Sequence, residues 1–95
     1  MADKMQQEIL ERATPALLSR LRRIEGQARG IQRMIEEKRD CQEVVTQVAA
    51  LKAAVEQVGV AMVGCLLEGA IRQAVAEGTD TTQAVEAAKA MLGQL

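Results

Sequence analysis

Two cysteines, Cys41 and Cys65, carry most of the chemistry that this 95-residue sequence can support, because the chain has no histidine and no aromatic residue. A thiolate is both a nucleophile and a soft metal ligand, so two thiols could act as a redox pair or bind Cu(I). The sequence contains no serine-centred motif and no glycine-rich phosphate loop. We therefore expect no enzymatic activity.

Both cysteines fall on one apolar seam of a helix predicted over about residues 41–76. The seam residues follow one another at alternating steps of three and four, which is the heptad pattern of a helix that packs on another helix. They are Cys41, Val44, Val48, Leu51, Val55, Val58, Met62 and Cys65. A rise of about 1.5 Å per residue separates the two thiols by about 36 Å, so they cannot meet within one chain.

The two thiols can meet between chains. Two copies of this helix that cross antiparallel at Ala53 would place Cys41 of one chain beside Cys65 of the other, twice, by two-fold symmetry. Ala53 lies among small residues that suit a close crossing, Ala49-Ala50-Leu51-Lys52-Ala53-Ala54. The alternative is that both cysteines are small apolar core residues.

Only Cys41 has a neighbourhood that favours reactivity. It is predicted to lie in the first turn of its helix, where the macrodipole favours a negative charge, and Arg39 is two residues away. Asp40 and Glu43 oppose this effect. Cys65 has no comparable activation.

The composition, rich in strong helix formers, predicts an all-α fold in a single domain over residues 1–95. Thr14-Pro15 is a helix start signal, which predicts a helix over about 15–38 after a flexible tail over 1–13. A short third helix is predicted over about 82–92, beyond the stop signal Gly78. A thin helical hairpin of this size buries little apolar surface, so we expect the chain to oligomerise.

Basic residues gather in the first predicted helix, although the net charge of the chain is −1. Nine of the twelve Lys and Arg residues lie within the first 39 positions, and arginine suits phosphate geometry. This distribution predicts a face for a polyanion such as DNA. The alternative is a solvated face with intrahelical ion pairs, such as Arg33 with Glu36 or Glu37. The candidate phosphate contacts are Arg20, Arg22, Arg23, Arg29 and Arg33, with Lys52 as a further candidate.

No targeting or membrane segment is expected. The N-terminal residues Met1-Ala2-Asp3-Lys4 are polar, and no uninterrupted apolar run approaches the roughly 18 residues that span a membrane. We expect a cytoplasmic protein with no membrane partner. In that reducing compartment, thiols are more often free, metal-binding or redox-active than part of a structural disulfide.

Three stretches together resemble the CsoR/RcnR family of bacterial transcriptional repressors, which sense copper, nickel or cobalt, aldehydes or reactive sulfur. They are Arg20-Leu-Arg-Arg-Ile-Glu-Gly-Gln-Ala-Arg-Gly-Ile, Asp40-Cys41 and Val45-Thr-Gln-Val-Ala-Ala, and the resemblance covers about residues 15–78. It implies a three-helix protomer with a long second helix and an antiparallel dimer that forms a four-helix bundle. It also implies a disc-shaped homotetramer and operator DNA bound by basic residues of the first two helices.

The resemblance is incomplete at the metal site that it implies. Cys41 matches the first ligand, but Leu66 and Ala70 stand where copper sensors have a histidine and a second cysteine. Nickel and cobalt sensors use several histidines, and this chain has none. The chain is therefore similar to the cysteine-only members, in which reactive sulfur or an oxidant modifies the first cysteine and the second resolves it into an interchain bridge.

Such a switch requires no cofactor. The first alternative is a repressor in which Cys41 and Cys65 are the metal ligands and hold Cu(I) as two thiolates. The second is a helical interaction module that binds an acidic protein instead of DNA and keeps its cysteines as core residues.

Overall fold

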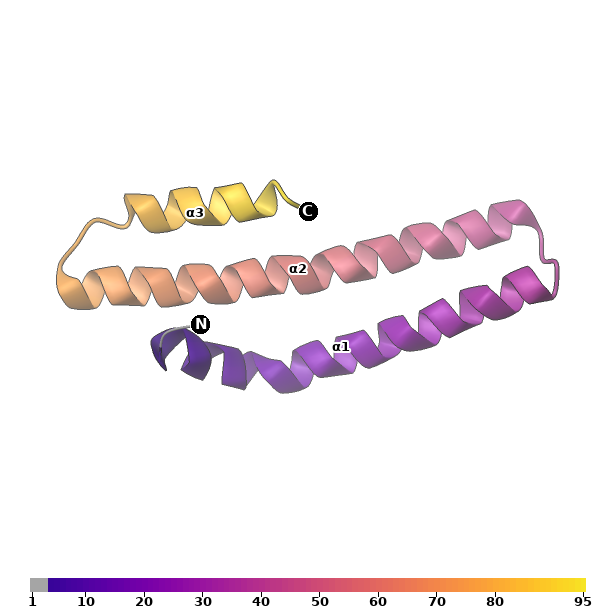
Figure 1. Ribbon diagram of the computed structural model, residues 1–95, viewed down its shortest axis with the longest axis horizontal. Coiled ribbons are helices and arrows are strands. Elements are labelled where there is room, and N and C mark those ends of the chain that lie inside the picture. Colours follow the sequence, from indigo (N-terminus) through magenta and orange to yellow (C-terminus); the bar gives the residue numbers. More distant parts are fainter. Residues whose placement is uncertain (1–3) are drawn as a thin grey trace.

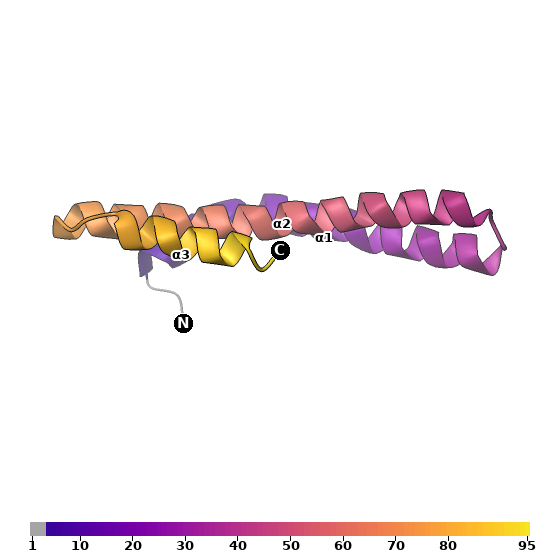
Figure 2. The same ribbon diagram turned by 90° about the horizontal axis from the view of Figure 1, so that it is seen from above.

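The computed structural model describes residues 4–95, and these residues form three α-helices and no strand. The helices are α1 (Lys4–Glu36), α2 (Cys41–Glu77) and α3 (Thr82–Leu92). α1 and α2 lie antiparallel along most of their lengths, and α3 folds back along the other edge of α2 (Figure 1). The protomer is thus an all-α, elongated and thin hairpin of 59 × 25 × 17 Å (Figure 2).

α2 is one uninterrupted helix with a clear signal at each end. Asp40 caps its start, where the carboxylate accepts a hydrogen bond from the Gln42 amide at 3.2 Å. Gly78 ends it in the left-handed conformation, with φ 69°, which glycine adopts without steric cost. The sequence predicted a helix over about 41–76, and the observed helix adds Glu77. α2 therefore carries Cys41 at its first residue and Cys65 well inside.

α1 begins at Lys4, so the prediction of a flexible tail followed by a helix start at Pro15 was wrong for residues 4–13. Residues 1–3 of the predicted tail lie outside the described residues. Pro15 lies inside the helix, where it removes one N–H donor, and α1 bends in its N-terminal part (Figure 1). The helix continues across the proline because Ile9 and Leu17, on either side of it, are both buried.

The early part of α1 packs on α2 at a glycine. Gly69 of α2 is buried, and a Cβ atom added there would lie 3.5 Å from the Gln6 backbone and 3.6 Å from the Ile9 side chain. Arg12 then pairs with Glu68 at 3.2 Å, and Arg72 approaches the same carboxylate oxygen at 3.4 Å. Apolar packing and an ion pair together hold the N-terminal turns of α1 against the C-terminal half of α2.

A tight turn between α1 and α2 fixes the position of Cys41. α1 ends at Glu36, two residues before the predicted limit, and Lys38 adopts a left-handed conformation with φ 57°. The Arg39 amide donates to the Met34 carbonyl at 2.9 Å, which closes the last turn of α1. The first turn of α2 consequently starts beside the last turns of α1.

α3 is anchored by a small apolar contact region and a local cap. Ala88 is buried, as are Val63 and Ala74 of α2, in the half of the hairpin that α3 covers. The Asp80 carboxylate accepts hydrogen bonds from the Thr82 hydroxyl at 2.6 Å and the Thr82 amide at 2.7 Å. The hydrogen bond from the Thr82 hydroxyl is the main reason that the pKa of Asp80 lies below its ordinary value, and the bond from the Thr82 amide adds to this effect.

The apolar seam of α2 is divided lengthwise into two sets, each recurring every seven residues. One set is exposed, and we call it the open set: Cys41, Val48, Val55 and Met62. The other is half-buried, and we call it the covered set: Val44, Leu51, Val58 and Cys65. One side of the seam is therefore sheltered within the protomer, while the other side is left without cover.

The exposed apolar side of α2 is extensive. By length and composition alone α2 could cross a membrane, and only 6% of its most apolar window is buried within the protomer. α2 nevertheless contains no uninterrupted apolar run of membrane-spanning length, because Glu43, Lys52, Glu56 and Glu68 interrupt it. Leaving this much apolar surface in water is unfavourable. The open set must therefore be covered by something outside the protomer.

Replacing Ile9 with alanine should lower the free energy of unfolding by about 2–3 kcal/mol, because it empties a buried position between α1 and α2. Thermal and urea unfolding followed by far-ultraviolet circular dichroism would measure the change. Glu8→Ala is the matched control, since Glu8 is exposed and its replacement should change stability by less than about 0.5 kcal/mol. Equal stability of the two variants would show that the first turns of α1 do not pack on α2.

Candidate sensing cysteines and nucleic-acid interface

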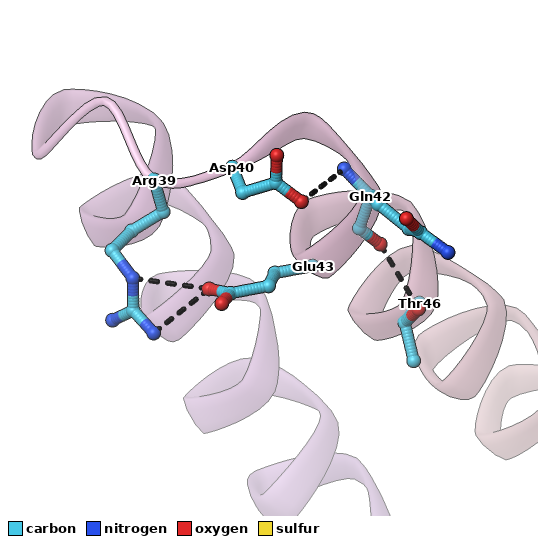
Figure 3. A network of polar contacts seen from close by, with 5 residues as sticks. All are labelled: Arg39, Asp40, Gln42, Glu43 and Thr46. Atoms are coloured by element: carbon cyan, nitrogen blue, oxygen red, sulfur yellow. Dashed lines mark hydrogen bonds and ion pairs between the residues drawn. The ribbon is translucent and has the colours of Figure 1, made fainter.

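Cys41 is exposed and is the first residue of α2. Figure 3 shows the polar contacts of nearby residues, Arg39, Asp40, Gln42, Glu43 and Thr46. The Arg39 guanidinium donates to the Glu43 carboxylate at 2.9 and 3.2 Å, and the Thr46 hydroxyl donates to the Gln42 carbonyl at 2.9 Å. Arg39, which the sequence placed beside the thiol, is thus paired with Glu43. The Arg39 charge is therefore shared with the Glu43 carboxylate and is not held for the thiol alone.

A recess of about 490 Å³ opens beside Cys41 between the facing ends of α1 and α2. We call it the Cys41 recess, and its walls combine aliphatic side chains with two cations: Ile35, Lys38, Arg39, Cys41, Val44 and Val45. Ile35 and Val45 are 61% and 65% exposed, which is unusual for such apolar residues and indicates that the recess is unfilled in the protomer. The recess can admit a small reagent or a side chain from another molecule.

Cys65 is half-buried on the side of α2 that faces α1. Gly69, one helical turn later, contacts Gln6 and Ile9, and Glu68 pairs with Arg12. The spacing of about 36 Å along α2 means that the structure does not bring Cys65 and Cys41 together within one protomer. The two thiols also differ in access, because only Cys41 is exposed.

The described part of the chain does not form a metal site within one protomer. Residues 4–95 contain no group of three or more His, Cys, Asp or Glu side chains placed to hold a metal ion. Leu66 and Ala70 are both half-buried, and neither side chain can donate to a metal. Among residues 4–95, the two thiols are the soft metal donors, and they do not come together within one protomer.

The five candidate arginines of α1 and Lys52 of α2 are all exposed. The ion pairs among residues 4–95 involve other cations, namely Arg12, Arg39, Arg72 and Lys89. Arg33 forms no pair with Glu36 or Glu37, so the intrahelical pairs that would make this a merely solvated face are absent from the described residues. The arginine charges are therefore available to an external anion.

These arginines fall on two different faces of α1. At about 100° per residue, Arg22, Arg29 and Arg33 lie on the side of the helix opposite to Ile24, which faces α2. We call these three the outer arginines. Arg20 and Arg23 instead lie at the edge of the α1–α2 contact, where they line a recess with residues of α2.

The sequence alone did not identify the α2 residues opposite Arg20 and Arg23, which are Ala54 and Gln57. Neither has a charge or a motif that marks it. They become identifiable only when the antiparallel alignment of α1 and α2 is known. The same holds for Arg12 and Glu68, which are 56 residues apart in the sequence.

Comparison with known proteins adds a family context. The family model described as metal-sensitive transcriptional repressor matches residues 13–94. The copper-sensing transcriptional repressor RicR of Mycobacterium tuberculosis is 48% identical over 59 residues, which cover 62% of this chain and 62% of RicR. The chain thus spans less than two thirds of that relative. The copper-sensing transcriptional repressor CsoR of Bacillus subtilis is 36% identical over 69 residues, 73% of this chain and 67% of CsoR.

A solved structure agrees with the fold. The nickel-responsive transcriptional regulator InrS superposes with a TM-score of 0.72 at 36% identity, covering 84% of this chain and 89% of that chain. The family match begins at residue 13, so the turns of α1 from Lys4 to Arg12 lie outside it. Those turns are the ones that pack on Gly69 and Glu68.

Cys41 should be alkylated several-fold faster than Cys65 by a small neutral reagent, because Cys41 is exposed and Cys65 is half-buried. Reduced protein would be treated with iodoacetamide, and the labelled fraction of each cysteine followed by peptide mass spectrometry. Denatured protein supplies the control, since both thiols are then equally accessible. Faster labelling of Cys65 in the folded protein would contradict the different exposure of the two sites.

Proposed function

Because this chain belongs to the metal-sensitive transcriptional repressor family, we propose that it is a cytoplasmic DNA-binding repressor whose operator affinity is switched by chemistry at a cysteine pair shared between two subunits. The observation that carries this proposal is the row of unpaired arginines on α1, on the same hairpin as the thiol-bearing seam of α2. Regulation of transcription, rather than catalysis, is the activity that these features support.

The outer arginines are the strongest candidates for phosphate contacts. They project from α1 opposite to α2, and no carboxylate of residues 4–95 forms an ion pair with them. Arginine binds phosphate oxygens in a planar fork, and each contact releases counterions from DNA. Lys52 and the edge pair Arg20 and Arg23 would extend this basic surface. Such binding depends mainly on charge, so its affinity should fall steeply with salt.

The division of the α2 seam supports an antiparallel homodimer. α1 shelters one half of the α2 seam, and the other half is exposed. This arrangement is expected of a helix in a four-helix bundle whose other two helices come from a second hairpin. A second hairpin crossing at Ala53 places each open-set residue opposite a covered-set residue. In this register Cys41 lies opposite the partner's Cys65, and Val48 lies opposite the partner's Val58. Val55 lies opposite the partner's Leu51, and Met62 lies opposite the partner's Val44. This register covers the whole open set.

The same register puts the two thiols in one layer at each end of the dimer. A polysulfide can transfer sulfur to the Cys41 thiolate, which becomes a persulfide as a shorter polysulfide leaves. The thiolate of the partner's Cys65 then attacks the Cys41 sulfur, the persulfide S–S bond breaks and hydrosulfide leaves. The resulting bridge between Cys41 and the partner's Cys65 ties the two hairpins together. We expect it to fix their crossing angle and weaken operator binding, because the arginine faces move with the hairpins.

Cu(I) is the second candidate inducer, and the names of the relatives RicR and CsoR favour it. Cu(I) is soft and can be held by two thiolates, so Cys41 and the partner's Cys65 would form a two-sulfur site. Leu66 and Ala70 offer no further ligand. The family resemblance also favours a tetramer made of two such dimers as the DNA-binding form.

Polysulfide should convert reduced protein to a covalent dimer, observed as a doubled mass under non-reducing conditions, because each Cys41 is paired with the partner's Cys65. Neither Cys65→Ala nor Cys41→Ala should form the Cys41–Cys65 bridge. Peptide mass spectrometry would identify the bridged cysteines, since a Cys41–Cys41 bridge would contradict the Ala53 register. If the protein retains Cu(I) against a competing chelator, but polysulfide does not change its mass, Cu(I) is the inducer instead.

Arg29→Ala and Arg33→Ala should each weaken binding to the DNA upstream of the chain's own gene by roughly tenfold at about 0.1 M salt, because each removes a phosphate contact from every subunit on the DNA. The slope of log affinity against log salt should become shallower in both variants. Lys89→Ala is the matched control, since Lys89 lies on α3 and is paired with Glu86. Light scattering should give an unchanged oligomer size. Unaltered DNA affinity would show that the outer arginines are only solvated.

A further inference from the structure

The Cys41 recess is open on one side in the protomer, and its lining carries an uncompensated positive charge. Lys38 lines the recess and forms no ion pair within residues 4–95, although Glu36 and Glu37 precede it in the chain. The second cation of the recess is paired with a carboxylate. An acidic side chain from outside the protomer would therefore suit the open side of the recess.

α1 has an uncovered apolar strip of its own, which we call the α1 strip: Leu18, Leu21 and Ile35, exposed at 43%, 40% and 61%. At about 100° per residue, the α1 strip lies to one side of the α1 residues that face α2. The open set of α2 likewise lies to one side of the α2 residues that face α1. The displacement has the same rotational sense on both helices, and because the helices are antiparallel, both exposed surfaces lie on the same edge of the hairpin. One partner hairpin can therefore cover both.

In the proposed antiparallel dimer, the early turns of α1 come level with the turn before the partner's α2. Ile9 packs against Gly69 of its own α2, so residues 10–11 lie beside residues 67–68. The proposed crossing point places residues 67–68 level with residues 38–39 of the other chain. Residues 10–11 of one subunit therefore lie level with the turn that lines the partner's Cys41 recess.

These two residues, Leu10 and Glu11, have the chemistry that the recess lacks. Leu10 is half-buried and lies on the same side of α1 as the α1 strip. Glu11 is exposed and forms no ion pair within residues 4–95. The family match begins at residue 13, so both residues lie outside the part of the chain that matches the family. An apolar and an acidic side chain at this level complement the aliphatic walls and the unpaired lysine of the recess.

We propose that the early α1 turns of each subunit supply the missing wall of the partner's Cys41 recess, and that Glu11 pairs there with the partner's Lys38. This inference rests on the proposed antiparallel dimer and names a residue that controls its thiol site. Lys38 alone would attract anions to the Cys41 thiol, and Glu11 balances that charge. Glu11 is thus a specificity-determining residue, which sets the preference of the partner's thiol between anionic and neutral reagents.

Iodoacetate and iodoacetamide, which are similar in size and differ by one charge, test this role on the reduced full chain without DNA. The rate of Cys41 labelling by each reagent would be followed by peptide mass spectrometry. Glu11→Gln should raise the ratio of the iodoacetate rate to the iodoacetamide rate about threefold at about 20 mM salt, and about 0.5 M salt should largely abolish the increase. Lys38→Gln should lower the ratio. The matched control Glu8→Gln removes the same charge from a position farther around α1 from the α1 strip, and should leave the ratio nearly unchanged.

Cross-linking tests the placement without relying on charge. The variant E11C/K38C, in a C41A/C65A background, should form a covalent dimer with the short cross-linker bis-maleimidoethane. Residues 11 and 38 are 27 positions apart along the hairpin arm, or about 40 Å, which is too far for a bridge within one chain. E11C and K38C, each alone in the same background, should remain uncross-linked.

An equal change of the rate ratio in Glu8→Gln and Glu11→Gln would overturn the proposal, because the effect would then be one of general charge. An absence of the E11C/K38C cross-link would also overturn it. In either case the proposed switch itself still stands if light scattering shows an oligomer and polysulfide joins Cys41 to the partner's Cys65. A protein that is monomeric by light scattering would overturn both.

Discussion

The apolar seam of α2 is the constraint on which the rest of this structure depends. One hairpin can shelter only the covered set, because α1 lies along a single side of α2 and α3 covers only its C-terminal half. Burying an aliphatic side chain is worth about 1.5–3 kcal/mol, so the exposed Val48, Val55 and Met62 strongly favour association. The same repeat that creates this need also places a cysteine at each end of the seam. In the proposed dimer, assembly and sensing would thus depend on one set of residues.

The charged residues that form ion pairs and the arginines that form none lie in different parts of the α1–α2 hairpin. On α3, Glu86 pairs with Lys89. The ion pairs that involve α2 are Glu68 with Arg12 and Arg72, and Glu43 with Arg39. These contacts hold α1 on α2 and close the turn before Cys41. The middle of α1 is left with arginines that have no internal partner. A chain with a net charge of −1 can in this way present a strongly basic surface.

Much of the fold follows from local sequence signals. The breaker-free run after Asp40, the glycine at position 78 and the apolar period define α2 well, and the short helix over 82–92 has the bounds that its flanking residues suggest. The start of α1 was misjudged because Pro15 is a common first helical residue. Packing of Ile9 on Gly69 outweighs that local signal, and no local pattern in residues 4–13 reveals a contact with a glycine sixty residues away. The division of the seam into an exposed and a half-buried set required knowledge of which side of α2 faces α1.

In the proposed antiparallel dimer, two copies of the long helix α2 would rotate relative to each other about Ala53. Cys41 and Cys65 each lie twelve residues from that point, or about 18 Å along the axis. A swing of only about 5° between two crossing helices displaces such an end by about 1.6 Å. That is close to the distance by which two sulfurs in van der Waals contact must approach to reach a bond of about 2.05 Å. In that proposed dimer, one disulfide at the end of the helix pair would therefore require only a small rigid rotation of the hairpins, and no helix would need to bend or unfold.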